Sequence, residues 1–178
     1  MDKQEAHTTG ISQSDRIPAD LLFRIDEAVT HYPVSKRSAS LPLLHLWQNH
    51  FGFIDDSAVN WISKRLDLEP INILELVTFY PWFRQQPAGK VCIRVCRTLS
   101  CALAGGFEVR DAFCTAAGIN PNAEMHGHTP PVSADGKFSV EFVECLASCG
   151  SGPVALINDD LVEDITPEGA AGILSQYH

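Results

Sequence analysis

The sequence predicts an α+β fold in which a small helical bundle is followed by an α/β domain. In the first half of the 178-residue chain, apolar residues recur at the spacing of helices that bury one face. After the turn-rich stretch Gln-Gln-Pro-Ala-Gly at residues 85–89 they alternate instead, as they do in strands. We therefore expect a polar, flexible tail over residues 1–16, the helical bundle over residues 17–86 and the α/β domain over residues 87–178.

Four apolar stripes predict four short helices in the bundle. Pro33 and Pro81 end the first and the fourth, because proline lacks a backbone donor and restricts the residue before it. Gly52 follows the second helix, and Asp56 and Ser57 are favourable N-cap residues for the third. The stripes are Leu21, Leu22, Ile25 and Val29; Leu41, Leu44, Trp47 and Phe51; Val59, Ile62 and Leu66; and, after Pro70, Ile73, Leu76, Val77 and Tyr80.

Strands and helices are both expected in the second domain. The order is β-α-β-β-β-α, or β-α-β-β-α if the hairpin strands count as the closing pair, and it is compatible with a thioredoxin-like α/β layer. The expected elements are a strand over 90–95, a helix over 102–117 that starts immediately after Cys101, a loop over 118–136, strands over 138–142 and 154–157, a turn over 158–160, a strand over 161–165 and a last helix from Thr166.

The charge balance disfavours nucleic acid as a partner. Lys and Arg number 13 against 22 Asp and Glu, which gives a net charge of −9. Neither an apolar leader after Met1 nor a run of about 18 apolar residues is present, so we expect a cytoplasmic chain with no direct membrane insertion. Cysteines in such a chain are typically metal-bound or catalytic rather than disulfide-bonded.

Two cysteine pairs, Cys96 with Cys101 and Cys145 with Cys149, each follow a strand-like run. Each pair can close a small loop around one iron. Thiolates are the soft ligands that iron-sulfur iron prefers, and a [2Fe-2S] cluster needs two on each iron. The four residues are therefore the candidate metal and cofactor ligands.

The chain holds six cysteines, and two of them are excluded from this set. Cys92 lies in mid-strand and Cys114 in mid-helix, where reduced cysteine behaves as a small buried hydrophobe. A ligand set that pairs Cys92 with Cys96 is the rival, but a residue within a paired strand has less freedom to aim at a metal.

Structural zinc is the alternative metal, since it also takes four thiolates. Zinc ribbons usually leave two residues between paired cysteines, whereas the gaps here are longer, so iron-sulfur is favoured. A dithiol redox site lacks its Cys-x-x-Cys motif. A Rieske centre needs histidines beside its cysteines, and we expect His126 and His128 to be exposed in the central loop.

Other chemistry is sparse in the sequence. No glycine-rich nucleotide motif is present, so FMN and NADH are expected on a partner subunit only. Glu141, Glu144, Glu163 and Asp164 are interpreted as a hydrated face rather than as acid-base pairs.

The residues resemble the thioredoxin-like [2Fe-2S] ferredoxin family, and within it the E-type component of NADH:quinone oxidoreductase. Nearly the whole ordered chain takes part. The connection between the two cysteine pairs looks longer than is usual in that family. The matching segments are Tyr-Pro-Val-Ser-Lys-Arg-Ser-Ala at 32–39, Val-Thr-Phe-Tyr at 77–80, the two cysteine loops at 95–101 and 144–149, Ile-Asn-Asp-Asp at 157–160 and Asp-Ile-Thr-Pro at 164–167.

This resemblance implies an electron-transfer subunit of an NADH dehydrogenase. A neighbouring flavoprotein subunit takes hydride from NADH onto FMN, and this chain accepts one electron on its cluster, within a peripheral arm of a larger complex. The equivalent subunit of a soluble NAD-linked hydrogenase or formate dehydrogenase is the first alternative. A zinc-stabilised interaction module without a redox role is the second.

Overall fold

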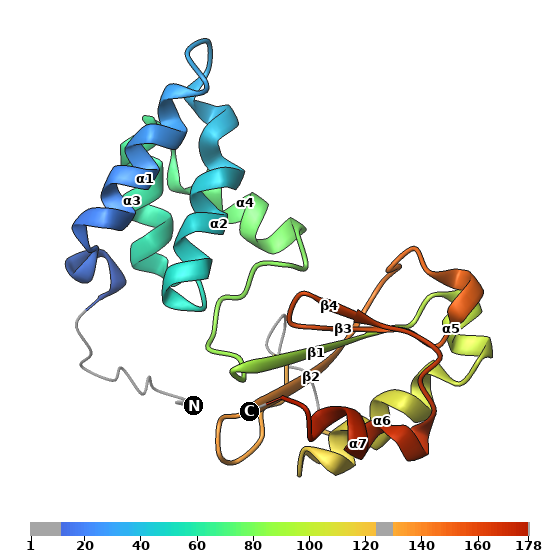
Figure 1. Cartoon of the computed structure of the whole chain (residues 1–178). Coiled ribbons are helices and arrows are strands. Elements are labelled where there is room, and N and C mark those ends of the chain that lie inside the picture. Colours follow the sequence, from blue (N-terminus) through green and yellow to red (C-terminus); the bar gives the residue numbers. More distant parts are fainter. Residues whose placement is uncertain (1–11, 124–129, 178) are drawn as a thin grey trace, which may run out of the picture. The chain divides into compact units, whose positions relative to one another are not determined.

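A computed structural model describes residues 12–123 and 130–177. It consists of helices and a four-stranded mixed sheet, which confirms the predicted α+β fold class. The chain divides into two compact units, the first ending at Gln86 and the second beginning at Pro87 (Figure 1). Within those described residues, none of the helices combines the length and apolarity needed to cross a bilayer.

The first unit contains the helices α1 (Ala19–Thr30), α2 (Ser40–Phe51), α3 (Asp56–Leu66) and α4 (Pro70–Phe79) in its described part. Gly52 ends α2 with a φ of 84°, a left-handed conformation that glycine adopts without a Cβ penalty. The cap of α3 differs from the prediction by one residue. Asp55, rather than Asp56 or Ser57, is the N-cap, because its Oδ1 accepts a hydrogen bond from the Ala58 N–H at 2.8 Å.

The flexible tail predicted over residues 1–16 extends too far, because its last residues are ordered. Residues 13–16 form a 3-10 helix, η1 (Gln13–Arg16), and Gln13 is buried. The Trp47 indole N–H donates to Gln13 Oε1 at 2.7 Å, and the Gln13 amide donates to the Phe53 carbonyl at 3.2 Å. These partners lie far along the chain, so a polar and aperiodic segment becomes part of the packed unit.

The second unit is built on a sheet of order β2-β1-β3-β4. Strand β1 (Val91–Cys96) runs parallel to β2 (Phe138–Val143). Strand β3 (Ala155–Ile157) is antiparallel to β1, and β4 (Asp160–Val162) is antiparallel to β3. Because β1 and β2 are parallel neighbours, the segments that follow them leave the sheet at the same edge.

One predicted helix is in fact two. Helix α5 (Leu99–Leu103) contains Cys101, and α6 (Gly106–Ala116) begins after Gly105, whose φ is 100°. The expectation that a single helix starts after Cys101 is therefore wrong, because the left-handed Gly105 interrupts the helical backbone. Helix α6 packs against β1 and β2, and α7 (Ala170–Leu174) packs against α6 (Figure 1).

Smaller differences concern the ends of the second unit's elements. Strand β4 stops at Val162, whereas the pattern extends it to Ile165. Thr166 behaves as predicted, since its Oγ1 accepts from the Gly169 N–H at 3.3 Å at the start of the 3-10 helix η4 (Pro167–Gly169), directly before α7. His126 and His128 lie outside the described residues.

Candidate metal centre

The two cysteine pairs lie where the ends of β1 and β2 meet the start of β3. Cys96, the last residue of β1, is in register with Val143, the last residue of β2. The Arg97 N–H donates to the Val143 carbonyl at 3.0 Å, and the Cys96 N–H donates to the Val154 carbonyl at 3.0 Å. The parallel pairing of β1 and β2 therefore brings together two loops that are distant in sequence.

The first pair, Cys96 and Cys101, is enclosed. Each residue is only 2% exposed, and both pack with Val154 and the half-buried Leu146. Burial raises the pKa of the Cys96 thiol. However, hydrogen bonds from the backbones of Thr98 and Leu146 and from the side chains of Cys101 and Thr98 together hold this pKa below its usual value.

Cys101 shares this environment with a cysteine of the second loop. Burial raises the pKa of the Cys101 thiol, and a hydrogen bond from the Val154 backbone opposes that increase. The neighbouring Cys96 and Cys149 sulfurs raise this pKa further, since a second negative charge nearby disfavours the thiolate. The structure thus brings Cys96 and Cys101 into direct contact, with Cys149 close enough to affect Cys101 electrostatically.

The second pair is presented on an irregular, exposed loop. Cys145 and Cys149 are both exposed, and Ala147 between them has a φ of 60°. Within this short turn the Ala147 N–H donates to Cys145 Sγ at 3.3 Å. The adjacent Leu146 N–H reaches Cys96. Backbone donors from one short turn therefore serve sulfurs of both pairs, an arrangement that tunes iron-sulfur centres.

Two glycines allow the backbone to come close to the first pair. A Cβ on Gly106 would lie 2.9 Å from the Cys101 carbonyl oxygen and 3.0 Å from that of Cys96. A Cβ on Gly152 would lie 3.2 Å from Cys101 Sγ, whereas one on Gly150 would meet nothing within 4 Å. The start of α6 and the end of the second loop are thus packed tightly around Cys101.

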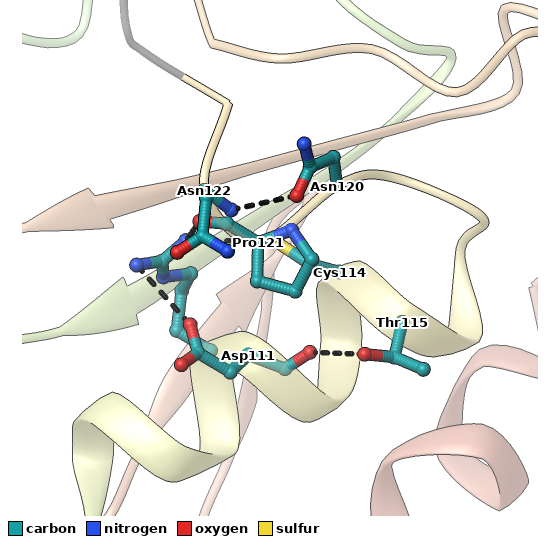
Figure 2. A network of polar contacts seen from close by, with 7 residues as sticks. Asp111, Cys114, Thr115, Asn120, Pro121 and Asn122 are labelled. Atoms are coloured by element: carbon teal, nitrogen blue, oxygen red, sulfur yellow. Dashed lines mark hydrogen bonds and ion pairs between the residues drawn. The ribbon is translucent and has the colours of Figure 1, made fainter.

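The two cysteines excluded from the candidate set have other surroundings. Cys92 Sγ donates to the Gly89 carbonyl at 3.2 Å. Cys114 is buried in α6, where burial raises the pKa of its thiol and the Arg110 guanidinium, 3.9 Å from Sγ, opposes the increase. Figure 2 shows Cys114 beside Pro121, whose carbonyl oxygen accepts from Arg110 Nη1 at 2.6 Å. This network packs the end of α6 against the segment that follows it.

The donors around the site were not visible in the sequence pattern. Backbone N–H groups of Thr98, Leu146 and Val154 carry no residue signature, because any non-proline residue supplies them. Glu163 is interpreted from sequence as part of a hydrated face, but it accepts hydrogen bonds from Ser148 and Ser151, which flank Cys149. Within residues 12–123 and 130–177, no three His, Cys, Asp or Glu side chains are grouped closely enough to hold a single ion.

Comparison with known proteins identifies the family of the chain. A model of the thioredoxin-like [2Fe-2S] ferredoxin family matches residues 25–178. The E-type NADH-quinone oxidoreductase subunit of Rickettsia bellii is 36% identical over 145 residues, which cover 81% of this chain and 82% of that protein. The corresponding NADH-quinone oxidoreductase subunit of Aquifex aeolicus is 33% identical over 161 residues, which cover 90% of this chain and 94% of that protein.

A solved structure shares the fold. The chain resembles a crystal structure of an NAD+-reducing [NiFe]-hydrogenase in the air-oxidized state with a TM-score of 0.55 and 18% identity. The match covers 93% of this chain and 24% of that one, and at this identity it supports the fold alone. The family resemblance inferred from the residues is confirmed, and the chain belongs to the thioredoxin-like [2Fe-2S] ferredoxin family.

Proposed function

We propose that Cys96, Cys101, Cys145 and Cys149 hold one [2Fe-2S] cluster, and that the chain is an electron-transfer subunit of an NADH:quinone oxidoreductase. The main support is the placement of the two cysteine pairs, which follow parallel neighbouring strands at one edge of the sheet. The cluster supplies one-electron redox chemistry when it is bound. The chain's own residues supply thiolates, backbone N–H donors and the burial of Cys96 and Cys101.

The flavin and the nicotinamide belong, in this proposal, to a partner subunit. The sequence has no glycine-rich phosphate cradle, and the relatives are subunits of a multi-subunit oxidoreductase. We propose that the partner's FMN would take the two electrons of a hydride from NADH and release them one at a time, and that this chain accepts one of them, on the cytoplasmic side of the membrane in a peripheral arm.

Metal analysis of the purified full-length chain tests the cluster. We expect about two irons and two sulfides per chain, visible absorption, and a paramagnetic signal after one-electron reduction. Zinc thiolates are colourless, so a colourless chain that contains zinc would replace this proposal with the structural zinc alternative. Stoichiometric FMN on this chain alone would contradict the assignment of the flavin to the partner.

The helical unit offers a candidate docking surface for the flavoprotein partner. Trp47 and Phe83 are buried in its core, but Phe79 is 74% exposed and stacks edge-on against Tyr80 with ring centroids 5.0 Å apart. Aromatic residues are enriched at the cores of interfaces. We expect Phe79→Ala to weaken capture of the flavoprotein by the tagged chain about 10-fold or more.

Phe23 provides the matched control for this experiment. It lies on α1 and is 70% exposed, so Phe23→Ala removes a similar exposed ring from another helix. If both variants captured the same amount of flavoprotein, Phe79 would not be part of the docking surface. Identification of the captured proteins also decides whether the parent complex is a quinone reductase or the alternative, a hydrogenase or formate dehydrogenase.

A further inference from the structure

Cys149 lies between two serines whose hydroxyl groups converge on one carboxylate. Ser148 Oγ and Ser151 Oγ both donate to Glu163 Oε1, and the two hydroxyl oxygens are 2.9 Å from each other. Glu163 follows β4 and is therefore remote in sequence from the loop that it contacts. A single side chain thus bridges the residues immediately before and shortly after Cys149.

The backbone reinforces this contact over the next residues. The Asp164 N–H donates to the Ser151 carbonyl at 2.8 Å, and the Ile165 N–H donates to the Pro153 carbonyl at 3.1 Å. The Ser151 N–H in turn donates to the Ser148 carbonyl at 3.3 Å. The segment after β4 therefore runs along the turn that carries Cys149 and is attached to it at several points.

An exposed carboxylate ordinarily contributes little, because water competes for its hydrogen bonds. Glu163 differs in having two hydroxyl donors from one short turn. The hydrogen bonds from Ser148 and then from Ser151 lower the pKa of Glu163, and burial opposes them. Hydrogen bonds to an ionised acceptor are stronger than those between neutral groups.

We propose that Glu163 is a positioning residue that holds Cys149 in place for the cluster by binding Ser148 and Ser151. The proposal rests on the ligand set proposed above. The second cysteine loop contains a left-handed alanine and is exposed at both of its cysteines. The backbone hydrogen bonds from Asp164 and Ile165 reach the loop only after Cys149, whereas the Glu163 carboxylate also binds Ser148, directly before it. The carboxylate therefore constrains the loop on both sides of Cys149.

The test compares Glu163→Ala with Glu163→Gln and Glu168→Ala in the full-length, cluster-loaded chain. Glu168→Ala removes the same charge from another exposed glutamate, in η4. Glu163→Gln keeps an acceptor oxygen. We expect Glu163→Ala to speed iron release to EDTA about 5- to 10-fold and to broaden the paramagnetic signal of the reduced protein. Glu163→Gln, which keeps the hydrogen bonds but loses the charge, should speed release about 2- to 3-fold, and Glu168→Ala should change neither.

Amide hydrogen exchange of the cluster-free chain gives a readout that does not depend on loading. The Ser151 and Asp164 amides should exchange faster in Glu163→Ala than in the wild type or in Glu168→Ala, with thermal unfolding unchanged. In a chain that already carries Ser148→Ala and Ser151→Ala, adding Glu163→Ala should have no further effect on either measurement.

The possible outcomes separate this inference from the proposed function. A wild-type chain that takes up no cluster contradicts the proposed function, while hydrogen exchange still tests the role of Glu163 in the loop. If the wild type is loaded and Glu163→Ala behaves like Glu168→Ala, the proposed function stands and Glu163 is not a positioning residue. The inference would also be overturned if Glu163→Ala sped iron release and amide exchange just as much in the chain that already carries Ser148→Ala and Ser151→Ala.

Discussion

The two cysteine pairs lie at one edge of a sheet but are held by different means. Cys96 ends a central strand and Cys101 lies in a helix, and both are buried. Cys145 and Cys149 lie on an exposed, irregular loop. The first pair therefore lies in regular, packed backbone. The second lies on a loop that contains a left-handed residue and makes backbone and side-chain hydrogen bonds to the segment after β4. Both kinds of support can bring a thiolate to the same place, but they respond differently to mutation.

The largest expected effect is on the cluster itself. Serine at Cys96, Cys101, Cys145 or Cys149 replaces a soft thiolate, so each variant should lose most of its iron. In the metal-free chain, the two pairs should differ in how substitution affects stability. Cys96→Ser and Cys101→Ser bury a more polar hydroxyl and should each lower the free energy of unfolding by about 1 kcal/mol. Serine at either exposed cysteine should change it by less than about 0.5 kcal/mol.

Iron analysis and urea unfolding of the metal-free variants provide the measurements for this series. Cys92→Ser and Cys114→Ser are the controls and should keep the cluster spectrum. A colourless Cys92→Ser variant beside a normally coloured Cys101→Ser variant would establish the rival ligand set.

Tight packing behind the first pair should have the next largest effect. Gly106→Ala puts a Cβ within 3.0 Å of the carbonyl oxygens of both Cys96 and Cys101, so backbone must move. We expect the free energy of unfolding of the metal-free chain to fall by about 2 to 3 kcal/mol, as in other overpacked sites. Gly150→Ala, in open space on the second loop, should change it by less than about 0.5 kcal/mol. Equal losses in a urea titration would show that the two loops are packed alike.

The smallest effect concerns the curl of the second loop. Ala147 has a φ of 60°, a conformation that costs a residue with a Cβ about 1 to 2 kcal/mol. Glycine avoids this cost, but its more flexible unfolded chain disfavours folding by about 0.4 to 1 kcal/mol. Ala147→Gly should therefore stabilise the metal-free chain by about 0.5 kcal/mol. Ala171→Gly, in the regular helix α7, should destabilise it by about 1 kcal/mol. If Ala147→Gly and Ala171→Gly shifted the melting temperature in the same direction, the backbone at Ala147 would not be strained.

Features that depend on neighbouring residues were predictable from the sequence. Gly52 ends α2, Pro70 begins α4, and Thr166 caps the last helical segment, because each acts through its own backbone or the adjacent turn. Alternation likewise located β1 and β2. The ligand candidates rest on similarly local information, since each pair is close in sequence.

Features that depend on distant residues cannot be predicted from local sequence patterns. The burial of Gln13 involves a hydrogen bond with Trp47, and Glu163 contacts Ser148 and Ser151. The interruption at Gly105 separates α5 from α6, which then packs closely on the carbonyl groups of the first pair. The order of strands shows no local signal either, so the parallel pairing that unites the two loops became apparent only from the fold.

The meeting of three strand ends at the site also restricts when, during biosynthesis, the cluster can be inserted. Cys101 receives a backbone hydrogen bond from Val154, just before β3, and the Cys96 N–H donates to the carbonyl of the same residue. The complete set of donors therefore exists only after β3 has been synthesised and has paired with β1, and such long-range pairing is slow. We therefore expect iron delivery to this chain to be a late step, so a ribosome-bound nascent chain halted before β3 should carry no cluster.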